Sequence, residues 1–580
     1  MSLRVASSIA TSALRTSEVG IAVASSNVAN ADTDGYTRKT ASNVTRSTGT
    51  NISSVDVTAV GSNVDRYLLK TLVAAQSDLG YADTRNSYLD QMQSAFGSVS
   101  DDDSGGTDIG SMIDALADTL GTLATSPESE SAKAATVQDL SDLAETLRST
   151  SSSVQSLRAQ ANDEIATTVD SINESLNSID SLNDQIVKGK ALGQNVTDLE
   201  DQRNTALKSL AKTIDVTYQV DDGGLMRIST ASGKSLLDSK VHELSYTPAA
   251  SVSAGTVYSA SGSSGFNGIM LNGVDVTGSS LGGTLGALVQ LRDTDLPAQQ
   301  ASLDELATTL MDTLNAIQNQ GTSYPAPQSL TGTETVSASD PLKVTSGTLR
   351  VAVTDSSGTA AEVLDIDLST MSTLQDVVDA INTMSNASAS ISADGKLVIS
   401  ADSASNGIAL GGDNGAFSDA YGMNDLLTGS GASDIKVATR IAGDSSLLAT
   451  GALSSTSGLT AGDTVLTSGE GSVAQALSAA FSTSYDFDAA GTSSARSTTF
   501  AGYAGAVVQG AATLADTASA AYDSQNTYAS SLESTFSSQS GVNVDEETAA
   551  ISTLQSAYEA AAAVMKTLQE MFSTALDMVQ

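Results

Sequence analysis

Apolar residues recur with a three-then-four spacing near both ends of the chain. That spacing places side chains along one narrow stripe of a helix, which suits pairing with another helix rather than covering a broad core. Neither end can bury such a stripe alone, so we expect the two terminal helices to pair with each other or with other subunits. The stripe residues are Leu3, Leu14, Ile21 and Val28 at one end and, within Ile551 to Val579, Ile551, Leu554, Tyr558, Met565, Leu568 and Phe572.

A near-heptad apolar pattern in the middle of the chain runs from Glu128 to Lys188. At about 1.5 Å per residue this pattern predicts a helix of roughly 90 Å, which needs partners along its length. Segments 196–214 and 285–317 carry apolar faces of their own, so we expect a long antiparallel helical bundle. Two β-like runs flank Asp221-Asp222-Gly223-Gly224 and predict a β-hairpin.

The remaining segments differ in composition. After the first helix a turn is expected at Asp34-Gly35, then an extended strand to about residue 65, a helix over 64–96 and a linker at Asp101 to Gly106. Short β-like runs among Gly, Ser, Thr and Asp predict an inserted β-rich domain over 324–499. Helical periodicity returns near Ala501, and Asn543 with Glu546 forms a capping-box pattern at the start of the last helix.

These patterns predict an α+β multidomain protein with paired terminal coiled-coil helices, a long antiparallel helical bundle and an inserted β-rich outer domain. The expected divisions are a terminal axial core (1–64 and 541–580), the bundle with its β-hairpin (65–240, 285–323 and 500–540), a small β-rich segment (241–284) and the outer domain (324–499).

Charge and composition narrow the possible functions. The 580 residues include 27 Lys and Arg against 67 Asp and Glu, a net charge of -40, so nucleic acid and anionic membranes are poor partners. We expect the excess Asp and Glu side chains to lie mostly on the outer domains. Cys is absent, which excludes disulfides and thiolate metal sites. The N-terminus lacks the pattern of a cleaved secretory signal, and no apolar run is long enough to span a membrane.

Residues with catalytic chemistry are sparse. The single His242 lies beside Glu243 in a polar β-like stretch, where a surface or hydrogen-bonded role is the main interpretation. Gly411 to Gly415 is similar to a calcium-binding turn, but its spacing is not repeated, so a β-turn is predicted. We therefore predict no catalytic, cofactor-binding or metal-ligating residues and no enzyme activity. A surface-layer protein or adhesin remains an alternative, and a glycan hydrolase ranks last because no persuasive pair of acids is present.

Two terminal motifs resemble those of the axial proteins of the bacterial flagellum, which are the rod, hook and hook-associated proteins. Segment 25–38 resembles their N-terminal motif, and segment 540–547 resembles their C-terminal motif. Segments 199–216 and 282–321 resemble the hook-associated protein 1 (FlgK) family, whereas hook and rod proteins have no such bundle. The motif residues are Asn27, Asn30, Gly35, Tyr36, Gly541 and Glu546.

The resemblance implies a structural subunit of the hook-filament junction that assembles as a ring, with the terminal helices lining the tube and the middle domains outside. Its implied partners are other copies of the chain, the hook protein, a second junction protein of the hook-associated protein 3 type, and an export chaperone bound to the C-terminal helix. The implied location is extracellular, after export through the flagellar secretion system without a cleaved signal, and no cofactor is implied. Another axial subunit, of the hook or rod, is the alternative within this group.

Overall fold

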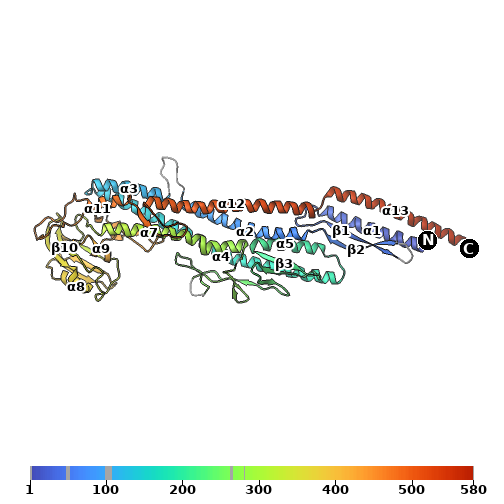
Figure 1. Cartoon of the computed structure of the whole chain (residues 1–580), viewed down its shortest axis with the longest axis horizontal. Helices are drawn as coiled ribbons and strands as arrows, with labels where there is room; N and C mark the ends of the chain where they lie inside the picture. Colours follow the sequence, from blue (N-terminus) through green and yellow to red (C-terminus); the bar gives the residue numbers. More distant parts are fainter. Residues whose placement is uncertain (1–2, 48–52, 98–107, 261–264, 280, 579–580) are drawn as a thin grey trace.

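The computed structural model describes residues 3–47, 53–97, 108–260, 265–279 and 281–578. The molecule is elongated, with the paired terminal helices at one end and a small β-rich domain at the other (Figure 1). The predicted linker at Asp101 to Gly106 and the last stripe position, Val579, lie outside the described residues.

Helices make up most of the fold. They are α1 (Leu3–Ala29), α2 (Arg66–Ala95), α3 (Ile109–Thr125), α4 (Glu130–Ala191), α5 (Thr197–Thr213), α6 (Gly283–Gln290), the π-helical turn η1 (Leu291–Asp295), α7 (Leu296–Gln318), the 3₁₀ turn η2 (Leu368–Thr370), α8 (Leu374–Ile381), α9 (Ala416–Tyr421), α10 (Thr439–Gly443), the 3₁₀ turn η3 (Ser445–Leu447), α11 (Ser472–Ala480), α12 (Phe500–Ser540) and α13 (Val544–Asp577).

The strands are short and form several small sheets. They are β1 (Lys39–Ser47), β2 (Ser53–Ser62), β3 (Val216–Val220), β4 (Met226–Thr230), β5 (Ser235–Leu237), β6 (Leu244–Ser245), β7 (Met270–Leu271), β8 (Val274–Asp275), β9 (Ser329–Thr331), β10 (Thr348–Asp355), β11 (Ala360–Asp367), β12 (Ala387–Ile391), β13 (Leu397–Ala401), β14 (Asn406–Gly411), β15 (Leu427–Thr428), β16 (Lys436–Val437), β17 (Tyr485–Phe487) and β18 (Arg496–Thr498). Together these elements confirm the predicted α+β multidomain class.

The terminal helices α1 and α13 pack side by side and run in opposite directions (Figure 1). Small residues line the contact: Ala10 and Ala24 are buried on α1, and Ala561 is buried on α13. A Cβ added to Gly20 would lie only 2.9 Å from Cδ1 of Leu554, so the glycine leaves room for the Leu554 side chain against α1. Beside this pair, β1 and β2 form an antiparallel hairpin where the sequence predicted one extended strand.

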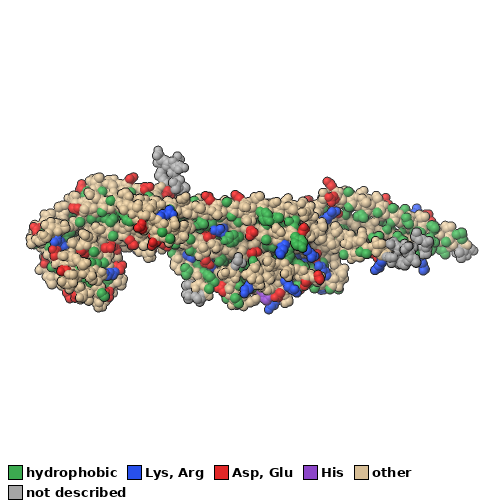
Figure 2. Space-filling view, viewed as in Figure 1, with side chains coloured by type: hydrophobic (Ala, Val, Ile, Leu, Met, Phe, Trp, Pro, Cys, Tyr) green, Lys and Arg blue, Asp and Glu red, His purple; other side chains and the backbone are tan. Residues whose placement is uncertain are grey.

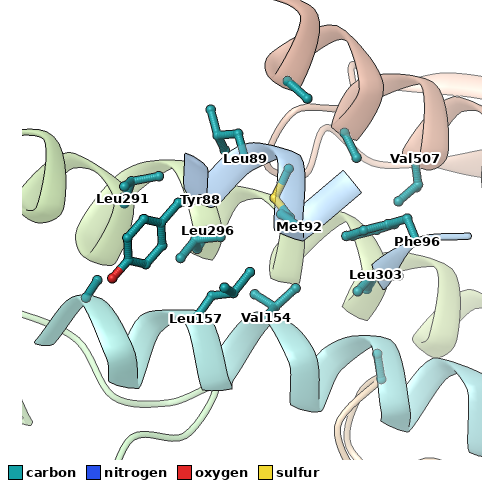
Figure 3. Packing of buried hydrophobic residues seen from close by; sticks show 14 of the residues in the cluster. Tyr88, Leu89, Met92, Phe96, Val154, Leu157, Leu291, Leu296, Leu303 and Val507 are labelled. Atoms are coloured by element: carbon teal, nitrogen blue, oxygen red, sulfur yellow. The ribbon is translucent and has the colours of Figure 1, made fainter. Parts of the chain in front are cut away.

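The bundle is built around α4, whose bounds agree closely with the predicted span of 128–188. Side chains of α2, α4 and the α6 to α7 segment meet in one apolar core (Figure 3). Helix α12 packs along α2 and adds Tyr503, Val507 and Ala511 to the same core (Figure 1). Helix α3 was not predicted as an element; it packs against α4 and α11, and its Leu116, Leu120 and Leu123 are almost fully buried.

A π-helical turn interrupts the helix predicted over 285–317. Arg292 lies in this turn and is fully buried. It pairs with Asp293 at 2.7 Å and donates a hydrogen bond to the hydroxyl of Tyr246 at 2.7 Å. The ring of Phe266 lies 4.6 Å from the Arg292 guanidinium carbon, within cation–π range. A second buried arginine, Arg158 of α4, donates to the carbonyl of Ser253 at 3.1 Å. The two arginines therefore fix the 241–284 segment to the bundle.

The outer domain has an apolar core of its own, with residues from Leu330 to Met423. The two sheets of this domain, β11-β10-β14 and β12-β13-β9, and helix α8 all contribute side chains to this core. The packing differs from the predicted span of 324–499, because apolar residues of 426–449 and 473–487 belong to the bundle core. Phe487, for example, stacks on Tyr503 of α12 with the ring centroids 4.0 Å apart. Leu453, Val465 and Leu466, which lie between these two ranges, pack against the outer sheet instead.

Deleting the outer domain tests this boundary. The Nδ2 atom of Asn424 donates to the carbonyl of Gly321 at 3.0 Å, so the chain enters and leaves the domain at one place. Removal of residues 324–423, with a short Gly-Ser linker, is expected to preserve cooperative unfolding of the bundle. Removal of 324–499 also takes Phe487 from the core, and losing a buried Phe costs about 3–5 kcal/mol. Thermal unfolding, monitored by circular dichroism, compares the stabilities of the two deletion variants. Equal stability would contradict the boundary at residue 423.

Candidate assembly site at the base of the terminal helices

The N-terminal family motif forms the turn that joins α1 to β1. The Asn30 backbone N–H donates to the carbonyl of Ser26 at 3.1 Å, and its side-chain Nδ2 donates to the same oxygen at 2.9 Å, which closes the end of α1. Gly35 has φ +76°, and a Cβ there would overlap the hydroxyl of Thr205 on α5. Both features favour glycine at position 35 and direct the following residues between α13 and α5.

Asn27 is the centre of the site and is fully buried. Its Nδ2 donates to the carbonyl of Lys39 at 2.9 Å and to Oε2 of Glu547 at 3.1 Å. Its Oδ1 accepts the Lys39 N–H and the Tyr36 hydroxyl, both at 3.0 Å. The amide thus makes the four hydrogen bonds it is capable of. One side chain therefore connects α1, the 36–39 segment and α13.

Glu547 joins the first turn of α13 to the same segment. Its Oε1 accepts from Nε of Arg38 at 2.6 Å, and its side chain is 4% exposed. Arg38 also donates its backbone N–H to the carbonyl of Ser540, the last residue of α12, at 2.8 Å. The Arg38 side chain is 32% exposed, whereas the Glu547 carboxylate is shielded from water, so removing Arg38 would leave a buried carboxylate without its cation.

The predicted capping box at α13 is only half formed. The Asn543 side chain accepts the N–H groups of Asp545 and Glu546, as expected of an N-cap. The Glu546 carboxylate does not complete the box; it lies 3.4 Å from Nη1 of Arg38 with a side chain 61% exposed. The sequence therefore pointed to Glu546, whereas the neighbouring Glu547 occupies the buried position.

A second ion pair joins the segment to the bundle. Nζ of Lys39 contacts the carboxylate of Asp201 on α5 and donates to the carbonyl of Thr197 at 3.2 Å. The same carboxylate accepts the Thr37 N–H at 2.9 Å and the Thr37 hydroxyl at 2.6 Å. The Lys39 and Asp201 side chains are 4% and 7% exposed. Their pairing fixes the terminal helices relative to α5.

Tyr36 completes the network. Its ring lies 4.8 Å from Nζ of Lys39, and burial raises the pKa of its hydroxyl, with the carboxylates of Asp198, Asp201 and Glu547 acting in the same direction. The hydroxyl therefore remains a neutral donor to Asn27 over the physiological pH range.

The predicted stripe residues divide into covered and uncovered positions. Leu568 is buried, while Tyr558 and Phe572 are 42% and 41% exposed. Val564 and Met571, which were not predicted as stripe residues, are each 51% exposed. Within the described chain α1 thus covers only part of the apolar surface of α13. The partly covered stripe residues are Leu3, Leu14, Ile21, Val28, Ile551, Leu554 and Met565.

The residues considered for catalytic or metal chemistry have structural partners. His242 contacts Asp238 through Nε2 at 3.0 Å, and Asp413 accepts the N–H groups of Gly415 and Phe417 at the start of α9. In the described ranges, no cluster of His, Cys, Asp and Glu has the composition and geometry to hold a metal ion. No described helix combines the length and apolar character needed to cross a membrane.

Sequence reasoning missed three residues of this network: Lys39, Asp201 and Glu547. A charged residue directly beside a motif was the available signal for Lys39 and Glu547. Asp201 lies in a segment that contributed to the family resemblance, but periodicity cannot show that its carboxylate faces Lys39 rather than water.

A matched pair of substitutions tests the buried ion pair. Glu547→Gln leaves Arg38 without its buried carboxylate, and such a loss costs about 1–3 kcal/mol. We expect amide hydrogen exchange in the first turns of α13 to accelerate by roughly ten- to a hundredfold. Glu546→Gln changes an exposed carboxylate, and exposed pairs are worth about 0.2–1 kcal/mol, so its effect should be much smaller. Equal effects would contradict the assignment of Glu547.

Three family models match separate parts of the chain. Residues 89–330 match the flagellar hook-associated protein FlgK helical domain. Residues 8–37 match the flagella basal body rod protein, and residues 533–578 match the flagellar basal body rod FlgEFG protein C-terminal model. The helical domain contains most of the bundle, and the two rod matches contain the terminal segments that form the network around Asn27.

Curated relatives agree with these matches. Flagellar hook-associated protein 1 of Salmonella typhimurium is 26% identical over 324 residues, which cover 54% of this chain and 56% of the relative. Its counterpart in Bacillus subtilis is 25% identical over 384 residues, which cover 60% of this chain and 74% of the relative. The alignment thus spans just over half the length of the Salmonella relative.

A solved structure is also similar. The flagellar hook junction protein FlgK from Burkholderia pseudomallei gives a TM-score of 0.47 at 18% identity, covering 80% of this chain and 99% of that one. The helical-domain match and the named relatives together support the flagellar hook-associated protein 1 (FlgK) family, a family of structural flagellar proteins, as the one that this chain resembles.

Proposed function

We propose that this chain is a structural subunit of the hook-filament junction and that its copies form a ring between hook and filament. The observation that carries the proposal is the uncovered apolar surface of α13. Large apolar side chains on this helix that stay exposed are Val544, Tyr558, Val564, Met571, Phe572, Leu576 and Met578. Six of these seven side chains lie between Tyr558 and Met578, and exposed apolar groups gathered in one region are typical of an interaction site.

The arrangement of α1 and α13 supports a tube built from several copies. Both helices extend from the same end of the bundle, well away from the outer domain (Figure 1). Copies packed side by side would bury the exposed part of α13 against the terminal helices of neighbours. The outer domain would then project away from the shared core, because it lies at the opposite end of the molecule.

The hook protein and a second junction protein of the hook-associated protein 3 type are the proposed partners above and below the ring. The relatives' names support association with the hook. Extracellular location in the flagellum, reached through the flagellar secretion system without a cleaved signal, follows from the same proposal. Another axial subunit, of the hook or rod, is less favoured because the bundle matches the FlgK helical domain.

An export chaperone would bind the same exposed surface of α13 before assembly, as an amphipathic helix fits a groove. A chain that ends at Gly541 lacks this helix and is expected to lose chaperone binding in a pull-down. Undiminished binding would place the chaperone site elsewhere.

The junction role is tested in a strain that lacks the gene for this chain. Electron microscopy should show hooks without filaments, and flagellin should accumulate in the culture medium because it has no junction on which to polymerise. Intact filaments would overturn the proposal and favour a surface-layer protein or a different axial subunit.

Substitutions on α13 separate assembly from folding. Met571→Asp alters a side chain that is 51% exposed, so the free chain should keep its helical signal in circular dichroism. In the assembled ring that position would be buried, and burying an isolated charge there is strongly unfavourable. We expect Met571→Asp to abolish filaments in the complemented strain. Ser573→Asp, also exposed on α13, is the matched control and should support filaments. Normal filaments with Met571→Asp would contradict the role of this surface.

Leu568→Asp should also abolish filaments, but for a different reason. Leu568 is buried in the free chain, and a charge there should weaken the pairing of α1 with α13 itself. Faster amide exchange in α1 would distinguish this variant from Met571→Asp.

A further inference from the structure

A groove of about 1160 Å³ lies beside the junction of the terminal helices and the bundle. Its walls come from β2, the first turn of α2, the end of α4, α5 and the β3 end of the hairpin. Tyr67, on the wall, is 87% exposed, and Leu192, next to the wall residue Gly193, is 64% exposed. Exposed side chains of this kind around a concavity are suited to receiving another protein surface.

The groove carries unpaired positive charge. Three of its carboxylates are already engaged by cations: Glu200 by Lys190, Asp201 by Lys39 and Asp221 by Arg227. Among the described residues, its remaining cations form no ion pair. Of these cations, Arg66 and Lys70 are exposed. Arg203 is buried and donates to Oδ1 of Asn183 and to the carbonyl of Gly224.

This positive region contrasts with the rest of the chain. Residues 1–97 and 188–240 together hold 16 Lys and Arg against 15 Asp and Glu, a net charge of +1. All other residues hold 11 Lys and Arg against 52 Asp and Glu, a net charge of -41. On the face shown in Figure 2, blue side chains gather near α5 and β3, and red ones predominate toward the outer domain. An acidic surface is therefore the favoured partner of the groove.

An acidic corner of the chain lies at the same level along the long axis, where α12 ends and α13 begins (Figure 1). Asp545 and Glu546 are exposed there, and Val544 between Asn543 and Asp545 is 44% exposed. The one cation in contact with this corner is Arg38, among the described residues, and it already binds Glu547. The corner thus combines net negative charge with an exposed apolar side chain.

The groove and the corner lie on opposite sides of the 37–39 segment. Thr37 and Lys39 contact Asp201 on the groove side, whereas Arg38 between them contacts Glu547 on the side of α13. Alternate residues of an extended segment point in opposite directions. Two different surfaces on opposite sides of one subunit are what a head-to-tail contact requires, and such contacts form a ring when the rotation between neighbours closes.

We infer that the α12–α13 corner of one copy docks into this groove of the next copy. The inference rests on the proposed ring and names the surfaces that would hold neighbouring subunits together. Asp545 and Glu546 meet the positive charge of Arg66 and Lys70, and Val544 packs against the apolar groove rim.

Disulfide trapping tests this contact, because the native chain contains no Cys. Leu192→Cys and Val544→Cys are introduced together, and flagella are isolated from the complemented strain, oxidised and blotted for this chain. A head-to-tail contact links each copy to two neighbours, so the expected result is a ladder that extends beyond dimers. Each single variant should give at most dimers.

A matched control uses Leu192→Cys with Tyr528→Cys, a comparably exposed position on α12 away from the corner. This pair should give no ladder. Incorporation of the Leu192–Val544 double variant without a ladder, or an equal ladder from the control pair, would overturn the proposed contact while leaving the ring intact. Absence of the unsubstituted chain from isolated flagella would overturn the ring and this contact together.

Charge reversal provides a second test. Arg66→Glu with Lys70→Glu in the double-cysteine chain should lower the yield of multimers by about tenfold, since like charges then face each other. Asp545→Lys added to the same chain should restore much of the yield. Unchanged multimers after charge reversal would contradict the electrostatic basis of the contact.

Discussion

The buried amide of Asn27 is the interaction on which the arrangement of this molecule depends. It is satisfied only when the end of α1, the 36–39 segment and the first turn of α13 are all in place. Each of these segments is short of apolar contacts of its own, so a shift of any of them would leave buried polar groups without partners. The energetic consequence is mainly one of specificity: a network with desolvated charges adds little net stability, but it strongly disfavours alternative positions.

The two parts of the axial region have opposite physical character. The base is polar, fully hydrogen-bonded and buried, whereas the helices that extend from it meet through alanines and a glycine. Small side chains allow close approach but remove little apolar area from water, so the pair by itself is only weakly stabilised. A fixed base with an incompletely covered extension is well suited to association, because the direction of the extension is set before neighbours bury its remaining surface.

Sequence patterns predicted the elements whose periodicity is long and regular. The near-heptad pattern of 128–188 located α4 to within a few residues, because each of its buried positions follows from helix geometry. Helix α3 is as long as the predicted α5 but was missed; it contains Gly110 and Gly121, and its burial depends on α4 and α11. The boundary at 499 failed for a related reason: composition stays rich in Gly and Ser after Met423, although Phe481 and Phe487 pack in the bundle. Local sequence carries no information about which of two cores an isolated aromatic side chain joins.

The adjacent entry and exit of the outer domain have a consequence for how such chains diversify. Because Gly321 and Asn424 are in contact, the outer domain is an insertion whose two ends meet at the bundle, like the ends of a closed loop. The entropy of closing a flexible loop rises only with the logarithm of its length, by about 0.6 kcal/mol for each doubling. Domains of very different size can therefore replace one another at this point with little effect on the core that anchors them. The outer domain could therefore change in size without altering the terminal helices or their polar base.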